Sequence, residues 1–403
     1  MRNDRPHVLV VHSRLETDPP SGGVGLCCWA IEALLDMGLR VTLLVPQTPD
    51  VRKLDSQFGT SLAEREFDIV VTPLGLAGVM RGILPRLGLL EHAAISRHAA
   101  SLCKKLKADI CFGTSNEMTF PVPWATYTHF PALCDERPEI DFRAYHASAI
   151  AVRAYRSLCK AILRFEKGDF ARGIQMVNSG FIRDLFREVH GVEPRVVAPP
   201  APGDFPRLDW DAKDDAFGMI GRFAPEKALP DAIRIVDLVR RNTGRQLELR
   251  LYGAWDCQGV ERREIEDCIA RHSDFVRVEA GLSRKELLTA LGRLRYGLHA
   301  MQGEHFGMAV AELLRAGAIP FVPNSGGPKA IVGDREELLW STVEEAADKI
   351  AALISEPKRA AGLHRQLRGE GEEYSEAAFM QNIQGVAQEL LDMRTERGAT
   401  ASA

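Results

Sequence analysis

The sequence predicts an α/β fold with two doubly wound parallel-sheet domains. Short apolar segments alternate with helical segments in both halves of the 403-residue chain, and this alternation is typical of parallel sheets covered by helices on both faces. The halves are separated at Ala198–Pro202, where three of five residues are proline. Neither a helix nor a central strand accommodates so many prolines, so this segment is predicted to be a linker.

The first half opens with an apolar strand, His7–His12. A loop rich in proline and glycine follows it, and Val24–Met37 is predicted to be a helix. Further strands are predicted at Arg40–Val45, Ile69–Thr72, Ile110–Phe112, Trp124–Thr128 and Gln175–Val177. Each is short and apolar, as expected for strands buried on both faces.

After the linker the alternation begins again. Strands are predicted at Ala216–Ile220, Glu248–Tyr252, Phe275–Val278, Gly297–Ala300 and Ile319–Val322. Ser375–Met393 reads as a final amphipathic helix, and the residues after Arg394 are expected to fray.

Composition excludes several classes of protein. A hydrophobic content of 45% and a net charge of −4 fit a soluble globular protein and do not favour nucleic-acid binding. The eight cysteines include no CxxC pair, which indicates reduced thiols in a cytoplasmic protein. No window approaches 18 uncharged apolar residues, and the first apolar run is too short for a signal peptide, so neither a transmembrane helix nor a leader is expected.

Two segments of the second half carry the candidate chemistry. In GRFAPEK, Arg222 and Lys227 follow an apolar strand, where a guanidinium fork and a Lys point charge suit a phosphate group; the alternative is an ordinary surface turn. In EHFGMAVAE, Glu304 and Glu312 lie seven residues apart along a turn and the following helix. Glu312 has apolar neighbours, and a buried carboxylate without a partner is costly, which favours a ligand role.

Taken together, EHFG…AELLRAGAIP…NSGGPK and GRFAPEK resemble the donor site of retaining glycosyltransferases with the GT-B fold. The string GLHAM before EHFG is most similar to the α-1,2-mannosyltransferases that extend lipid-linked oligosaccharide from GDP-mannose. SGGVG, YTHFP and VNSGF, in the first half, occur in the matching order. The resemblance therefore covers most of the chain.

The resemblance implies a role for each part of the chain. Residues 1–198 would bind the acceptor, residues 203–374 the nucleotide sugar, and residues 375–403 would carry a helix back to the first domain. Arg222 and Lys227 would stabilise the leaving diphosphate, Glu304 and His129 would contact the transferred sugar, and Glu312 would bind the ribose. The other donor-binding residues implied are Gly22, Gly23, His305, Phe306, Gly307, Met308, Asn324, Ser325, Gly326 and Gly327.

No cofactor or metal is expected beyond the nucleotide sugar, which is a substrate. No Asp-x-Asp pair stands at the end of a predicted strand, and His299 and His305 lack the carboxylate partners of a metal site. Two other functions remain open from the residues themselves: a nucleotide-sugar epimerase or hydrolase of the same fold, and a catalytically silent nucleotide-sugar-binding subunit.

One segment suggests contact with a membrane. Val71–Leu90 is apolar, and residues 81–107 contain six cations and one acid. An element of this kind could bring the protein to the inner face of an anionic membrane, where a lipid-linked acceptor would lie. The alternative is a helix and loop that cover the sheet, which the five glycines and prolines between Gly75 and Gly88 favour.

Overall fold

The computed structural model describes residues 5–13, 15, 21–72, 88–131, 157–163 and 168–401, with side chains except at 88 and 398–401. Internal contacts divide the chain into two units, Met1–Pro200 with Glu376–Ala403, and Ala201–Ser375. Most of Val71–Leu90, the segment considered for membrane contact, lies outside the described residues. Within the described part of the chain, no helix is long and apolar enough to span a membrane.

The first unit contains a seven-stranded sheet in the order β3-β2-β1-β4-β5-β6-β7. Its strands are β1 (His7–Val11), β2 (Arg40–Val45), β3 (Asp68–Val71), β4 (Ile110–Gly113), β5 (Trp124–Thr128), β6 (Ile174–Val177) and β7 (Arg195–Val196). Its helices are α1 (Gly22–Asp36), α2 (Val51–Phe58), α4 (Gly88–Leu106), α6 (Gly180–His190) and α14 (Glu376–Ala401). All the pairings between these strands are parallel.

Alternate residues of β1 face two separate apolar clusters. Val8 and Val10 pack with residues of α1 and α14, whereas Leu9 and Val11 pack with residues of α4 and α6. Successive side chains of a strand point to opposite faces of the sheet, so helices cover both faces. This is why the central strands β1, β4, β5 and β6 are buried along their whole length.

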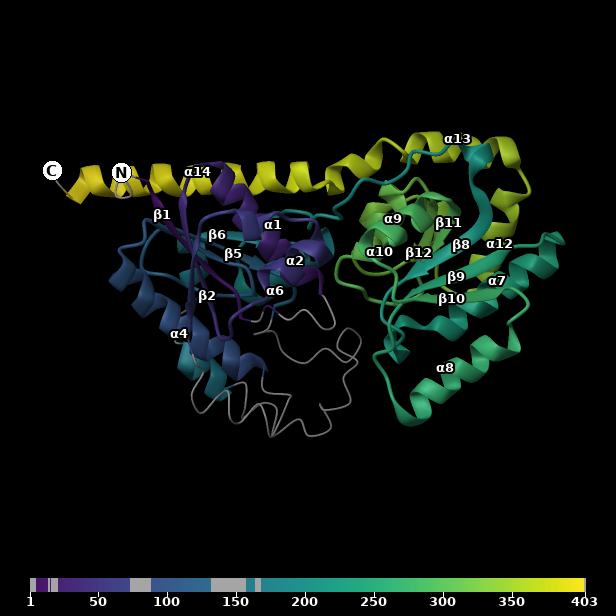
Figure 1. Cartoon of the computed structure of the whole chain (residues 1–403), viewed down its shortest axis with the longest axis horizontal. Coiled ribbons are helices and arrows are strands. Elements are labelled where there is room, and N and C mark those ends of the chain that lie inside the picture. Colours follow the sequence, from purple (N-terminus) through teal and green to yellow (C-terminus); the bar gives the residue numbers. More distant parts are fainter. Residues whose placement is uncertain are drawn as a thin grey trace. The chain divides into compact units, whose positions relative to one another are not determined.

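Helix α14 belongs to the first unit, although its residues come last in the sequence (Figure 1). Its buried side chains recur at helical spacing along one face, at Phe379, Ile383, Val386, Ala387 and Leu390. Gln384 donates to the Ala33 carbonyl of α1 at 3.3 Å, and Arg394 pairs with Asp109 at 2.6 Å. The helix continues to Ala401, beyond Arg394, where the sequence led us to expect fraying.

The second unit contains a six-stranded sheet in the order β10-β9-β8-β11-β12-β13, and its pairings are also parallel. Its strands are β8 (Asp214–Ile220), β9 (Glu248–Gly253), β10 (Val276–Ala280), β11 (Leu294–Leu298), β12 (Ile319–Pro323) and β13 (Leu339–Trp340). Its helices are α7 (Leu229–Thr243), α8 (Gly259–Arg271), α9 (Arg284–Gly292), α10 (Met308–Arg315), α11 (Pro328–Ile331), α12 (Val343–Ile354) and α13 (Pro357–Leu367). The predicted α/β class with two parallel-sheet domains is confirmed.

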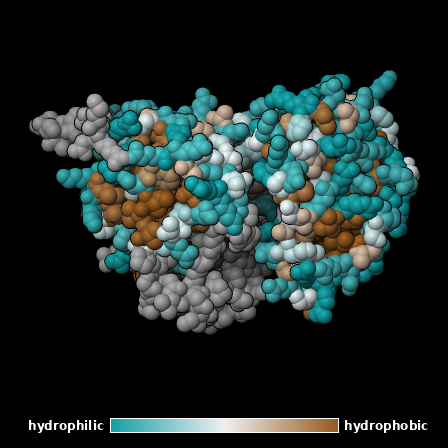
Figure 2. Space-filling view, in the orientation of Figure 1, coloured by the Kyte–Doolittle hydropathy of each residue, from teal (hydrophilic) through white to brown (hydrophobic). Residues whose placement is uncertain are grey.

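One face of the described part of the chain is largely polar. The view in Figure 2 is mostly hydrophilic, with a hydrophobic patch on each unit. The large apolar side chains that are exposed in the described residues are all aliphatic: Val71, Leu158, Val196, Val260 and Val278.

Candidate functional site

The candidate residues of the second unit gather where its strand order reverses. Strand β8 lies between β9 and β11, so chain segments leaving β8 and β11 diverge to opposite sides. In doubly wound sheets ligands bind at this position, outside the carboxyl ends of the strands. Arg222 and Lys227 follow β8, and Glu304 follows β11.

Lys227 and Glu304 form an ion pair across this point. The Lys227 Nζ lies 2.6 Å from Glu304 Oε2, and the two side chains are 16% and 19% exposed. A short turn, η5 (Pro225–Lys227), positions the lysine, and Ala228 then takes φ of +50° before α7 begins. The Lys227 ammonium also lies 3.3 Å from the Met301 sulfur. A partly buried cation is thus held in place at the edge of the sheet.

The charge of Glu304 is maintained by its surroundings. Burial by itself would raise the pKa of this carboxyl, but the charge of Lys227, and after it that of His299, lowers the pKa to about 2. His299 is 3% exposed, and its Nε2 lies 3.9 Å from Glu304 Oε2. Burial lowers the pKa of His299 to about 4, so its ring is neutral at pH 7. From the sequence, His299 was considered only as a metal ligand, and rejected as one.

Arg222 is the more exposed of the two predicted cations. Its guanidinium pairs with Asp256, which follows β9, and with Glu226 at 3.1 Å. An ideal Cβ on the neighbouring Gly221 would lie 3.7 Å from Lys227 Cε. The backbone at Arg222 therefore runs beside the lysine stem, but the two cations hold different carboxylates.

Glu312 has a protein partner that the sequence did not reveal. It is 8% exposed in α10, and its Oε1 lies 2.5 Å from Arg284 Nη1. Arg284 is the first residue of α9, where Ser283 and Glu286 form a capping box, and it also donates to the Pro202 carbonyl. Arg284 supplies the charge that offsets the burial of Glu312, so burial by itself does not call for a ligand, and the ribose role stays a prediction.

The NSGG turn after β12 supports the turn that carries Glu304. The Ser325 hydroxyl accepts from the Gly303 N–H at 3.0 Å, and the Gly327 N–H donates to the Glu304 carbonyl at 2.8 Å. An ideal Cβ on Gly326 would lie 2.3 Å from that same carbonyl oxygen, and φ is +72°. Glycine is required at position 326 because the backbone there approaches the backbone of Glu304 closely. This requirement would hold even if no ligand bound at the turn.

The remaining predicted donor residues surround the same turn. Phe306 is 6% exposed and packs edge-on against Tyr374, with ring centroids 5.9 Å apart. Gly307 has φ of +105° and precedes Met308, the first residue of α10. The Asn324 N–H donates to the Trp340 carbonyl at 2.7 Å. The side chain of Phe306 thus contributes to the packing of the second unit.

A second group of candidate residues lies at the equivalent edge of the first sheet, where β1 and β4 diverge. His129 follows β5; its Nε2 donates to the Thr114 carbonyl at 3.1 Å, and its carbonyl accepts from Asn178 at 3.0 Å. His12 contacts the Thr114 hydroxyl at 2.8 Å.

The glycine pair also belongs to this edge. Gly22 is the first residue of α1, and an ideal Cβ on Gly23 would lie 3.2 Å from His129 Nε2. The start of α1 and the histidine are therefore neighbours within the first unit. A side chain at position 23 would crowd the imidazole, so close packing explains why this position is a glycine.

No group of three or more His, Cys, Asp or Glu side chains is arranged to hold a metal ion within the ranges that the structure describes. The seven cysteines described are all free and buried.

Comparison with known proteins identifies the second unit. Residues 202–369 match the family described as glycosyl transferases group 1. These residues are a group 1 glycosyltransferase domain. The Lys227–Glu304 pair and the NSGG turn both lie inside it.

The curated relatives each match part of the chain. The chain is 25% identical over 287 residues to a GDP-Man:Man(3)GlcNAc(2)-PP-Dol alpha-1,2-mannosyltransferase of Dictyostelium discoideum, a match that covers 63% of this chain and 57% of that protein. The Homo sapiens protein of the same name is 32% identical over 151 residues, which cover 34% of this chain and 30% of that protein. The chain thus spans less than two thirds of the length of these relatives.

Solved structures share the fold over nearly the whole chain. Anabaena HepE, crystallised with UDP and glucose, matches with a TM-score of 0.64 and 14% identity, covering 96% of this chain and 100% of that one. Sucrose-phosphate synthase from Thermosynechococcus elongatus matches with a TM-score of 0.65 and 16% identity, covering 96% and 100%. The fold is GT-B, as the sequence motifs predicted.

Proposed function

We propose that this protein is a retaining, metal-independent glycosyltransferase that moves a mannosyl group from GDP-mannose to a glycan acceptor, with a lipid-linked oligosaccharide the leading candidate. The observation that carries this proposal is the Lys227–Glu304 pair at the strand-order reversal of a group 1 glycosyltransferase domain. It supplies a fixed cation and a fixed anion where a nucleotide sugar would meet the sheet edge.

In the proposed reaction, the bond between the sugar C1 and the diphosphate breaks while a bond forms from C1 to an acceptor hydroxyl oxygen. The electron pair of the broken bond goes to the diphosphate, and the hydroxyl proton passes to a phosphate oxygen on the same face of the sugar. Lys227 and Arg222 offset the negative charge that develops on the diphosphate. Such preorganised electrostatic stabilisation needs no metal.

The anionic group of the site has a separate task. Glu304 is ionised at neutral pH because Lys227 lies beside it, so its oxygens can only accept hydrogen bonds. We assign it to sugar hydroxyls, and Glu312 to the ribose. His129 remains our candidate from the first unit for contact with the sugar, and no metal or organic cofactor is part of the proposal.

The choice of donor and acceptor is supported by the names of the curated relatives, which specify GDP-mannose and a dolichol-diphosphate oligosaccharide. A site that hydrogen-bonds one base edge leaves buried groups unpaired when another base enters, so the preference is expected to be sharp. One such loss costs about 1–3 kcal/mol, or roughly ten- to a hundredfold in affinity.

The test is transfer from a panel of nucleotide sugars with GDP-mannose included, together with calorimetric titration of GDP and UDP. We expect mannosyl transfer with retention and tighter binding of GDP. Release of free sugar or an epimerised donor would support the hydrolase or epimerase instead, and binding without turnover would support a silent subunit. Tenfold tighter binding of UDP would refute the GDP-mannose assignment while leaving glycosyl transfer in place.

The catalytic assignment is tested with a matched pair of lysines. Lys227→Ala is expected to lower turnover by about 10²–10³ with the fold intact. Lys285→Ala, at an exposed position of α9 in the same domain, serves as the control and should leave turnover unchanged. Equal turnover of the two variants would refute the role of Lys227.

We also propose that the protein meets a lipid-linked acceptor at the inner face of the membrane as a peripheral protein. Co-sedimentation of the full chain with anionic vesicles, and its release by salt, would support this contact. Absence from the vesicle pellet at low ionic strength would contradict it.

A further inference from the structure

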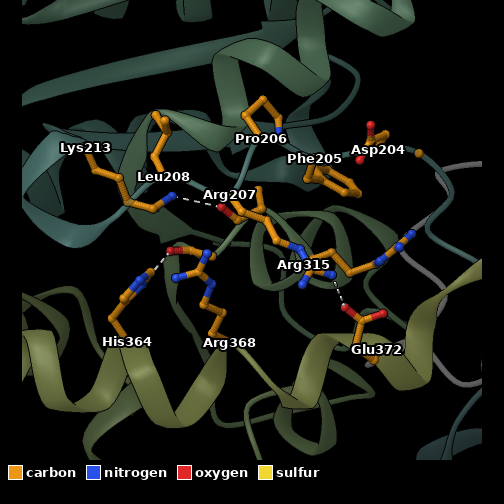
Figure 3. Close-up of a pocket in the computed structure, with 13 residues that line it drawn as sticks. Asp204, Phe205, Pro206, Arg207, Leu208, Lys213, Arg315, His364, Arg368 and Glu372 are labelled. Carbon is orange, nitrogen blue, oxygen red and sulfur yellow. Dashed lines mark hydrogen bonds and ion pairs between the residues drawn. The ribbon is translucent and has the colours of Figure 1, made fainter.

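A cationic pocket lies at the opposite end of the second sheet from the Lys227–Glu304 pair. It is bordered by the segments that precede β8 and β12, and by α13 and the turn after it; the side chains that line it include Lys213, Arg207, Arg315, Arg368, His364 and Glu372 (Figure 3). Lys213 immediately precedes β8, a strand of seven residues. At about 3.3 Å per residue, roughly 25 Å separates it from the residues that follow β8.

One side of the pocket is lined by a buried lysine that has no carboxylate partner. Lys213 is 4% exposed, and its Nζ donates to the carbonyls of Gly292 (2.6 Å), Ala316 (2.8 Å) and Leu294 (3.3 Å). Within the described residues no carboxylate lies within 4.0 Å of this ammonium. Its three N–H donors are satisfied, but its charge is not neutralised.

The charges around Lys213 leave the pocket positive. Four cations line it, Lys213 and the three arginines, against two acids, Asp204 and Glu372. Arg207 donates to Glu372 at 2.9 Å, and Arg368 lies 3.8 Å from Asp209, whose side chain is 94% exposed. Each guanidinium has five N–H donors, so these contacts leave Arg207 and Arg368 with donors for a ligand.

His364 adds a hydrogen-bond acceptor. The ring is 3% exposed, and its Nδ1 donates to the Gly317 carbonyl at 2.9 Å. Its Nε2 is buried and has no hydrogen-bond partner. Burial, and after it the charge of Lys213, lowers the pKa of His364, so the ring is neutral and Nε2 presents a lone pair.

The size of the pocket limits what can enter. Its volume is about 60 Å³, and a water needs roughly 10–15 Å³ on this measure, so about four oxygen-sized atoms fit. Gly317 has φ of +72°, and an ideal Cβ there would lie 3.3 Å from His364 Cε1 and 3.6 Å from Lys213 Nζ. The missing side chain keeps the space between these two groups open. His364 of α13, and Arg368 just after the helix, project toward it (Figure 3).

We propose that this pocket binds inorganic phosphate. Four oxygens match the volume, the anion offsets the charge of Lys213, Arg207 and Arg368 donate to its oxygens, and its P–OH group donates to His364 Nε2. The last contact separates phosphate from sulfate, which carries no proton at neutral pH and would meet Nε2 with an acceptor. The site is distinct from the nucleotide-sugar site, and the proposal stands whatever the donor of the enzyme.

The experiment is a phosphate titration of the full chain at pH 7, followed through imidazole ¹⁵N signals, with sulfate at equal ionic strength as comparison. The His364 signal is identified by its loss in His364→Asn, which keeps a donor for Gly317, and independently by its contact with the Trp210 ring, 5.2 Å away. We expect phosphate to shift this signal saturably, and sulfate to bind at least tenfold more weakly.

Two arginine variants, one near the C-terminal end of α13 and one just after it, provide the matched test. Arg368→Gln removes a lining guanidinium and should weaken phosphate binding about tenfold or more. Arg365→Gln changes an exposed position of α13 that does not line the pocket. The phosphate affinity of this variant should stay within twofold of that of the wild type. An unmoved His364 signal, equal affinities of the two variants, or equal affinities for phosphate and sulfate would overturn the proposal.

Discussion

Replacing Lys227 with methionine tests the electrostatics of the candidate site directly. The substitution keeps a long unbranched side chain and removes the ammonium that lies 2.6 Å from Glu304. Burial is already the largest single influence on the Glu304 carboxyl, and without the ammonium that opposes it burial favours the neutral form.

The magnitude follows from the pKa. Lys227 and its neighbours hold the pKa of Glu304 at about 2, whereas the ordinary pKa of a glutamate is 4.5. That difference corresponds to about 3 kcal/mol. Because the folded-state pKa is the lower one, this stabilisation is fully present above pH 4.5 and is lost as the pH falls from there toward 2. In Lys227→Met the pKa should rise to 4.5 or higher, and the free energy of unfolding at pH 7 should fall by a similar amount.

The assay is a titration of the glutamate side-chain carboxyl ¹³C signals between pH 4 and 8, with Glu304 assigned by its loss in Glu304→Gln. In the wild type the signal should stay constant over this range, since its pKa lies below it. In Lys227→Met it should titrate, and Lys227→Arg, which keeps a cation, should behave like the wild type. A Glu304 signal that stays constant in Lys227→Met would show that Lys227 is not what keeps the carboxylate ionised.

Three further outcomes are expected. Gly326→Ala should weaken nucleotide binding, measured by calorimetry, and destabilise the second unit, measured by urea unfolding. The loss of stability should exceed the roughly 1–3 kcal/mol of a left-handed residue, because the new Cβ would meet the Glu304 carbonyl. Unchanged values would contradict the backbone contact. Arg284→Met should leave Glu312 buried without its cation and lower the free energy of unfolding by about 3–5 kcal/mol. The double variant Arg284→Met with Glu312→Gln should recover part of this stability in urea unfolding. No recovery would mean that the two residues are not coupled. Glycosyl transfer should persist in EDTA, and its loss with recovery on adding Mg²⁺ or Mn²⁺ would show that a metal, rather than Arg222 and Lys227, balances the diphosphate.

Much of the fold could be predicted from sequence, because the signals for it are local. Uniformly apolar segments marked the central strands, and three prolines between Ala198 and Pro202 marked the passage between the two α/β halves. The motifs around Glu304 and Lys227 were also recognisable as strings, since turns that follow strands depend on a few neighbouring residues.

The partners of the charged residues were decided by tertiary structure. Glu312 is 28 residues from Arg284, and Lys227 is 77 residues from Glu304; each pair meets only because the strand order sets which turns share an edge. No sequence pattern marks Lys213 or His364. The unneutralised charge of the lysine and the unpaired nitrogen of the imidazole depend on which groups lie near them in the folded protein. The sequence determined the segments that form strands, helices and turns, whereas the order of the strands in the sheet decided which side chains face one another, because that order joins residues far apart in the chain.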